Sequence, residues 1–255
     1  ELGGQTIVAN VMREGISEEL PAGFIEDDVV ELFAAVAEAM INGGDTTQIG
    51  EGMGAFIIAD AAMITSDSDA DDIFGAIYTQ SSDEDMVGVA LVPGIGGKGI
   101  MVIAAGTEVS NIPTLGEFHY EGANFSAIIS QGDEEIDQAD EETNGDYGSF
   151  KATVDFAAGK GSINADFQNA PTIIDGDFTV DTATGIFVGD KLELIVEDQL
   201  ADTVTIHGNF HGDGATGMTG IYTPNVAETN FIGAIAGQQV TPTVIIDSLD
   251  NQSQF

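Results

Sequence analysis

Apolar and polar residues alternate through much of the last third of the chain, in short segments bounded by glycines. The clearest alternating segments are Lys151–Phe156, Ser162–Phe167, Thr203–His207 and Asn230–Ile235. Because successive side chains of a strand point to opposite faces, this period predicts strands with one buried face and one face in water. Several such strands joined by tight turns predict an antiparallel sheet that closes on itself.

The first half carries short apolar runs instead, which predict strands that are more fully buried. These runs are Ala55–Ala59, Ile73–Tyr78, Val87–Val92 and Gly99–Ala104. Polar or glycine-rich turns are expected between them, at 65–72, 80–85 and 93–99. A further break is expected at 132–148, where seven acidic residues lie between Asp133 and Glu142. That stretch is too polar to pack, so we interpret it as a mobile hairpin loop.

One segment has helical periodicity. It carries a capping-box pattern at Asp28 and Glu31 and is followed by glycines at 43 and 44, which predicts a helix over 28–41. The apolar residues that share its face are Val29, Leu32, Phe33, Val36 and Met40. The expected role of this helix is to cover one side of a sheet, and the alternative is a helix that binds a partner.

Charge is the outstanding feature of the composition. The 255 residues include 44 acidic and 5 basic ones, for a formal net charge of −39, while 43% of the chain is hydrophobic. This field repels phosphate backbones and anionic lipid, which argues against nucleic-acid binding and electrostatic docking on membranes. The carboxylates are spread along the chain, as expected for a hydrated surface of the halophilic type. A basic partner or a cation is the alternative.

The absence of cysteine does not fix the compartment, because a large β core can be stable outside the cell without disulfides. The chain begins at Glu1 rather than Met, as expected after removal of a signal peptide. It has no apolar run long enough for a transmembrane helix.

Two loops resemble ligand sites at first sight. Residues 93–99, Pro-Gly-Ile-Gly-Gly-Lys-Gly, suggest a phosphate cradle, but they lack the GK[ST] ending and a following helix, so a hairpin loop is expected. Asp67, Asp69 and Asp71 alternate as in a calcium loop. However, Asp72 occupies the position of the glycine and Tyr78 that of the bidentate glutamate. Calcium binding there is therefore an open alternative to a plain polar turn.

The three histidines are the side chains whose ordinary pKa lies nearest neutrality. His207 and His211 share strand parity with Thr203, Thr205 and Asn209, so both are expected to face outward. Four residues along a strand span about 13 Å, too far for the pair to hold one ion. His119 alternates with Phe118 and Tyr120. Solvated wall positions are expected for all three, with axial ligation of haem by one of them as the alternative.

No catalytic signature stands out. The chain has no Gly-x-Ser-x-Gly elbow and no HExxH motif. With so many carboxylates, the nearness of two of them in sequence indicates no acid–base site. A binding function without catalysis is therefore expected.

Three passages resemble the barrel domain of the transferrin-binding protein B-like surface proteins. They are 112–122 (preceded by the Gly-Thr of 106–107), 150–161 with its Thr-Val-Asp-Phe and glycine turn, and 207–220 continued by 231–237. The resemblance covers about half of the chain. It implies that Gly208, Gly212 and Gly220 serve turns and that Phe210 lies in the barrel interior.

This resemblance implies a mainly β fold, with a handle-like β-rich region over 1–112 followed by an eight-stranded antiparallel barrel over 113–240. The helix predicted over 28–41 departs from the family handle. The tail over 241–255 contains a possible extra strand. The resemblance also implies a non-catalytic protein, exported to the outer cell surface or secreted, that binds a protein or a small iron-related ligand. The alternative is a structural subunit of a surface layer, filament or appendage, which self-assembles when Thr6–Ala9 or Thr243–Ile246 pairs with a neighbour's sheet edge.

Overall fold

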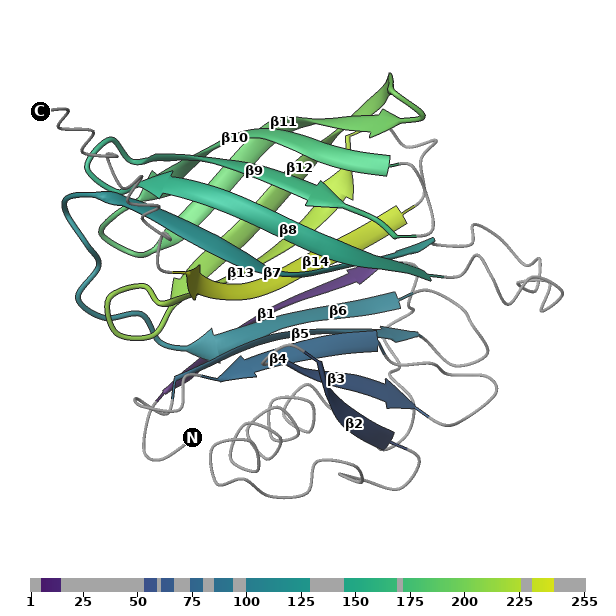
Figure 1. Ribbon diagram of the computed structural model, residues 1–255, viewed down its shortest axis with the longest axis horizontal. Coiled ribbons are helices and arrows are strands. Elements are labelled where there is room, and N and C mark those ends of the chain that lie inside the picture. Colours follow the sequence, from purple (N-terminus) through teal and green to yellow (C-terminus); the bar gives the residue numbers. More distant parts are fainter. Residues whose placement is uncertain are drawn as a thin grey trace, which may run out of the picture.

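The computed structural model describes residues 6–14, 53–58, 61–66, 74–79, 85–93, 100–128, 145–168, 172–225 and 231–240. The described part is mainly β, with a closed eight-stranded antiparallel barrel beside a six-stranded sheet (Figure 1). No helix occurs among these residues. The predicted helix over 28–41 lies outside them, as do the calcium-like loop at 67–72 and Thr243–Ile246.

The six-stranded sheet, called here the handle sheet, contains the first six strands in the order β1-β6-β5-β4-β3-β2. All neighbouring pairs are antiparallel. The strands are β1 (Ile7–Glu14), β2 (Met53–Ile58), β3 (Ala61–Ser66), β4 (Phe74–Thr79), β5 (Met86–Pro93) and β6 (Ile100–Thr107).

The barrel is closed in the order β10-β11-β12-β13-β14-β7-β8-β9, and β9 pairs with β10 to complete the circle. Its strands are β7 (Glu117–Ile128), β8 (Gly145–Asp155), β9 (Lys160–Asp166), β10 (Thr172–Asp181), β11 (Ile186–Val196), β12 (Gln199–His211), β13 (Gly217–Pro224) and β14 (Phe231–Val240). Closure joins every strand to two neighbours, so the barrel has no free edge.

Strand boundaries correct two of the sequence-based expectations. Thr65 and Ser66, expected in a turn, belong to β3, a strand that the apolar runs did not indicate. Gly145–Gly148, expected in the acidic break, begins β8. The glycine-rich segment at 93–99 connects paired antiparallel strands, with Pro93 opposite Ile100, and its residues 94–99 lie outside the described part. The mobile loop expected over 132–148 likewise falls mostly outside, at 132–144.

Buried and exposed side chains alternate along β9 as predicted. In β9, Ile163 and Ala165 are buried while Ser162, Asn164 and Asp166 are exposed. Side chains of one parity therefore fill the interior and those of the other parity meet water.

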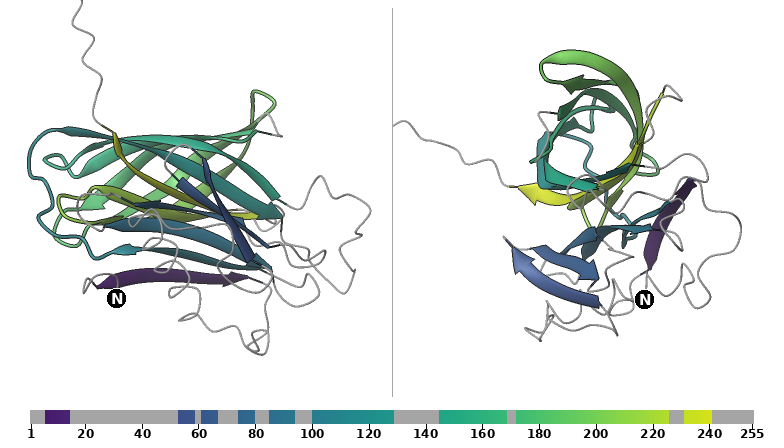
Figure 2. Two further views of the ribbon diagram at one scale, coloured as in Figure 1. Left: turned by 60° about the horizontal axis from the view of Figure 1, so that its bottom comes forward. Right: turned by 90° about the vertical axis from the view of Figure 1, so that its right-hand side faces the viewer.

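Strand β14 departs from the prediction of one wet face. Its side chains from Ile232 to Ala236 are all buried, as are those of β13 from Met218 to Tyr222. The reason is the handle sheet, which packs on the outside of the barrel. Figure 2 shows the barrel nearly along its axis, with the handle sheet against one side. Both faces of β13 and β14 consequently contact protein.

Candidate functional site

The barrel interior is a packed core. Its inward side chains form one buried cluster in which every member of the aromatic group Tyr120, Phe150, Phe156, Phe178, Phe187, Phe210 and Tyr222 is at most 3% exposed. Ring centroids lie 5.0 Å apart for Phe156–Phe210 and 5.4 Å apart for Phe187–Phe210. Eight-stranded barrels are narrow enough for side chains to fill them. The interior therefore has no room for a ligand, and the walls and loops are the candidate binding surfaces.

Two glycines leave room for one of these rings. Gly208 and Gly220 lie opposite each other on β12 and β13, and a side chain at either would meet the ring of Phe187. These glycines therefore lie within strands, which corrects the turn role that the resemblance implied. Gly212 does occupy a loop, with a φ of +76° that favours glycine. Phe210 lies in the interior as expected, 1% exposed.

The joint between handle sheet and barrel is a second apolar layer. Small and branched side chains from the outside of β7, β13 and β14 pack against side chains of β4, β5 and β6. The buried members are Ala76, Tyr78, Val87, Val89, Leu91, Val102, Ala104, Ala123, Phe125, Ile221, Ile232, Ala234 and Ala236. Burial raises the pKa of Tyr78 to about 12, so this phenol stays neutral in the joint.

His211 lies in this joint, which corrects the expectation that it faces water. Its strand parity is outward as predicted, but the outer wall at this end of β12 is covered by β6, and the side chain is 1% exposed. The ring lies directly over Gly106, where any Cβ would overlap it. Parity thus identifies the face of the barrel on which His211 lies, whereas solvent access depends on the second sheet.

The hydrogen bonds of His211 define its protonation state. Nδ1 lies 3.3 Å from the Thr107 carbonyl oxygen and Nε2 lies 2.8 Å from Thr219 Oγ1. A carbonyl only accepts, so Nδ1 carries the proton and Nε2 accepts from the threonine hydroxyl. Burial lowers the pKa of His211 to about 4, and the bond to Thr107 opposes that shift. With both nitrogens engaged inside the joint, His211 cannot ligate haem.

The loop between β12 and β13 fastens the barrel to the segment 108–116 that precedes it. The backbone amides of Ser110 and Gly214 donate to the carbonyls of Gly212 and Ser110, at 3.1 and 2.8 Å. From inside the barrel, the Tyr120 hydroxyl donates to the Ala215 carbonyl at 2.6 Å. The Gly212 amide also donates to the Thr107 carbonyl at 3.1 Å. This one loop therefore connects the barrel core, the preceding segment and the handle sheet.

Replacing Tyr120 by Phe should lower the free energy of unfolding by about 1–3 kcal/mol, because the buried Ala215 carbonyl would lose its donor. Urea denaturation measures this change. Ile186→Val removes a methyl group from a side chain that is 46% exposed and should stay within about 0.5 kcal/mol of wild type. Equal effects in both variants would show that the hydroxyl does not hold the loop.

Asp85 and Asp213 extend the same joint. Asp85 was expected in a polar turn, yet it is 5% exposed, and its Oδ2 accepts from the Asp213 amide at 3.0 Å. Asp213 Oδ1 accepts from Asn111 Nδ2 at 2.6 Å and from Ser110 Oγ at 2.8 Å, and these bonds hold the pKa of Asp213 below its usual value. Nothing in the local sequence signals that Asp85 is buried, because its partners come from distant segments.

A small cavity beside His211 is lined by Tyr78, Asp85, Thr216 and Gln238, among others. It is about the size of one water molecule and admits no organic ligand. The joint is therefore a structural connection, and the candidate binding surface is the exposed wall.

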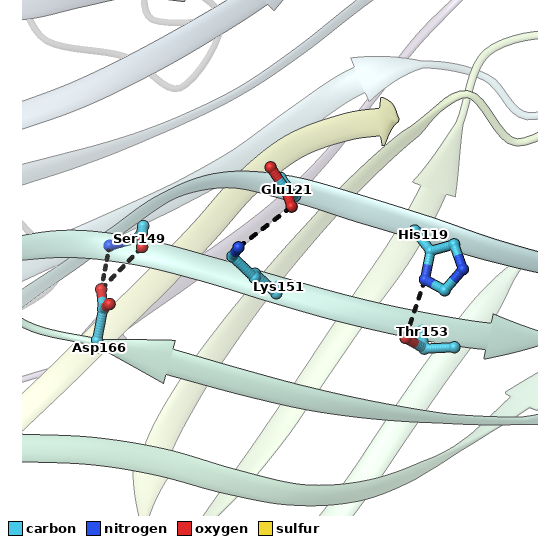
Figure 3. Close-up of polar contacts among 6 residues, drawn as sticks. All are labelled: His119, Glu121, Ser149, Lys151, Thr153 and Asp166. Carbon is cyan, nitrogen blue, oxygen red and sulfur yellow. Dashed lines mark hydrogen bonds and ion pairs between the residues drawn. The ribbon is translucent and has the colours of Figure 1, made fainter. Parts of the chain in front are cut away.

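The exposed wall on β7, β8 and β9 is lined by polar pairs (Figure 3). Lys151 Nζ lies 3.4 Å from Glu121 Oε1, and Asp166 Oδ1 accepts from the amide and hydroxyl of Ser149 at 2.7 and 2.9 Å. His119 Nδ1 lies 3.2 Å from Thr153 Oγ1. His119 is half-buried and is engaged by its neighbours on the wall.

The histidines do not converge on a common ligand. His207 is exposed on β12, opposite Ile221 of β13. Its register row continues through Ala234 to Phe125 on β7, six residues from His119, or about 20 Å along the strand. His207 and His119 thus lie on the wall as predicted. Across the described ranges, no group of three or more His, Asp or Glu side chains is placed to hold a metal ion.

No helix in the described part of the chain is long and apolar enough to cross a membrane.

A family model described as the C-lobe and N-lobe beta barrels of Tf-binding protein B matches residues 112–239, half of the chain. No curated protein sequence matches.

Several solved structures are similar in fold. One is intact Ap-TbpB with N and C lobes, at 15% identity over 77% of this chain and 42% of that one, with a TM-score of 0.45. Another is a double mutant of transferrin-binding protein B from Haemophilus parasuis, at 17% identity, 92% and 45% coverage and a TM-score of 0.48. A third is the isotype 1 protein from serogroup B Neisseria meningitidis, at 14% identity, 72% and 37% coverage and a TM-score of 0.47.

The chain thus spans less than half the length of each of these structures. The family itself follows from the match over 112–239 together with the closed eight-stranded barrel, and both agree with the passages that carried the resemblance in the sequence. The chain belongs to the family of transferrin-binding protein B β-barrels.

Proposed function

We propose that this protein is an exported, non-catalytic binding protein of the outer cell surface, and that its partner is a protein or a small ligand connected with iron. The observation that carries the proposal is the filled barrel in a chain that belongs to this family. A core packed with aromatic rings leaves the outer wall and loops for recognition, and such surfaces suit a protein partner.

A protein partner is favoured over haem. His211 has both ring nitrogens engaged, and His119 and His207 lie far apart on the wall. The net charge of −39 favours a partner with a basic surface. The division into a handle-like region at 1–112, a barrel at 113–240 and a tail at 241–255 remains part of the proposal.

The alternative is a structural subunit that assembles by sheet-edge pairing, and only the edge of the handle sheet supports it. Thr6–Ala9 is already paired on one side with β6, where Ile7 lies opposite Thr107. Among the described strands, β1 ends the handle sheet, so its other side is the edge at which a neighbour's strand would pair. Sedimentation velocity at high protein and salt concentration distinguishes the two, since a strict monomer excludes the subunit.

Affinity capture tests the proposal directly. The immobilised full chain is incubated with native medium or membrane extract, and an unrelated folded protein of similar negative charge serves as the control. We expect mass spectrometry to find a protein enriched on the chain but not on the control. Enrichment of the same proteins on both would contradict the proposal. In parallel, an unchanged Soret band after addition of haem would exclude the haem version.

A further inference from the structure

An exposed apolar row lies on the outer wall at the β11–β12 turn. It is formed by Ile173 of β10, Ile195 of β11 and Leu200 of β12, which are register neighbours across the three strands. Ile174 and Leu194 point into the core, so their chain neighbours Ile173 and Ile195 point outward. Leu200 lies on the same outward face, directly opposite Ile195. Leu200 is 63% exposed, whereas Ile173 and Ile195 are half-buried. We call these three residues the corner row.

Carboxylates surround the corner row. Asp166 lies opposite Ile173 on β9, and one step further along the same face Asp175 lies directly opposite Glu193. Like charges that face each other across a strand pair destabilise the sheet. Asp166 and Asp175 accept hydrogen bonds from Ser149 and Asn164, respectively. Both donors are uncharged, so these bonds bring no positive charge to the corner row.

The turn beside the corner row is strained. Glu197 and Asp198 have φ values of 50° and 62°, the left-handed region that two-residue hairpin turns require and that Asn and Gly occupy more readily. Facing carboxylates and a left-handed glutamate each lower stability, and an exposed leucine adds little to it. Proteins tolerate destabilising features of this kind at functional sites. Their concentration beside one turn therefore indicates a binding surface.

The position of the corner leaves it open to a partner. Figure 1 places β10 and β11 on the side of the barrel away from the handle sheet. Since the barrel is closed, a partner finds no strand edge here and must be recognised through side chains. Aliphatic side chains call for an apolar residue in the partner, and the surrounding carboxylates call for Lys or Arg.

We propose that the corner row and its carboxylates dock a protein segment that presents apolar side chains flanked by Lys or Arg. This inference rests on the proposed function and specifies where the partner binds and what its surface is like. A second copy of the chain and an anionic membrane are disfavoured as occupants, because both carry the same sign of charge as the corner.

A defined probe tests the site. The full chain is titrated calorimetrically with a synthetic peptide of alternating Leu and Lys, with two matched peptides in which Ser replaces Leu or Glu replaces Lys. Leu200→Ser should weaken binding of the Leu–Lys peptide about fivefold or more, because it removes the most exposed apolar contact. Ile186→Ser alters an exposed side chain elsewhere on the barrel wall and should leave the affinity within about twofold.

The variant Glu193→Gln distinguishes a role of this carboxylate in binding from a role in the fold. It should weaken binding of the Leu–Lys peptide while raising the Tm by about 1–3 °C, because the repulsion with Asp175 is removed. Leu200→Ser should keep the wild-type Tm, since its side chain is mostly in water. A Tm loss of many degrees in Leu200→Ser would instead show that the leucine serves the fold.

The inference is overturned if Leu200→Ser and Ile186→Ser change the affinity equally, or if the Ser–Lys peptide binds as tightly as the Leu–Lys peptide. Concentration-dependent sedimentation abolished by Leu200→Ser would identify a second copy as the occupant and overturn it too. If Leu200→Ser still captures the native partner as wild type does, the corner is not the docking site while the proposed function stands. If wild type captures no partner, the proposed function fails.

Discussion

Gly106→Val should lower the free energy of unfolding by about 3 kcal/mol or more, the largest effect expected for a single residue of the joint. A Cβ at this position would lie 2.5 Å from His211 Cγ and 2.6 Å from Nδ1. The ring cannot move aside without losing its bonds to Thr107 and Thr219 in a buried setting. Urea denaturation followed by circular dichroism measures the loss.

Gly214→Val is the matched control. Its Cβ would meet no atom within 4 Å, so only the strain of its positive φ, +74°, should cost stability, about 1–2 kcal/mol. The double variant Gly106→Ala/His211→Ala should lose less than the sum of its single variants, because removal of the ring relieves the clash. Additive losses would mean that the glycine and the histidine do not constrain each other.

Stability should fall as the pH decreases from about 6.5 to about 4, with His211 as the cause. In the folded protein burial lowers the pKa of His211 from 6.5 to about 4. The unfolded chain therefore binds a proton in this window that the folded chain does not, and stability is lost as pH falls. A shift of this size corresponds to about 3 kcal/mol, and below pH 4 the contribution should level off.

The measurement is the difference in unfolding free energy between wild type and His211→Asn across pH 4–7. Taking the difference removes the shared titration of the many carboxylates. A difference for His211→Asn that does not change with pH would refute the buried neutral imidazole and the joint built around it.

Much of the fold followed from local sequence pattern. The segments around Ile163 and Ile206 alternate because one face of each strand meets the core and the other meets water. Glycine-containing turns, such as the one ending at Gly159 (φ +62°), could likewise be predicted from a few neighbouring residues. These features depend on a residue and its chain neighbours, and for that reason a single sequence reveals them.

The candidate site was less accessible to sequence reasoning. Leu200 has the strand parity of the inward Val204 and Ile206, yet register shifts between β11 and β12 bring it opposite the outward Ile195. Asp85 and His211 looked solvated because their partners lie far away in the chain. The order of apolar residues does not encode a bulge or a contact between two sheets.

Sequence reasoning alone was enough to show that the chain forms Gly-punctuated strands, carries a strongly negative charge and resembles one family of barrels. These properties reside in composition and in short-range periodicity. The folded arrangement was needed to show that the barrel is filled, that the handle sheet covers β13 and β14, and that His211 is buried beneath it. The physical reason is that burial depends on which surfaces meet in space, and two sheets far apart in sequence meet only after the chain has folded.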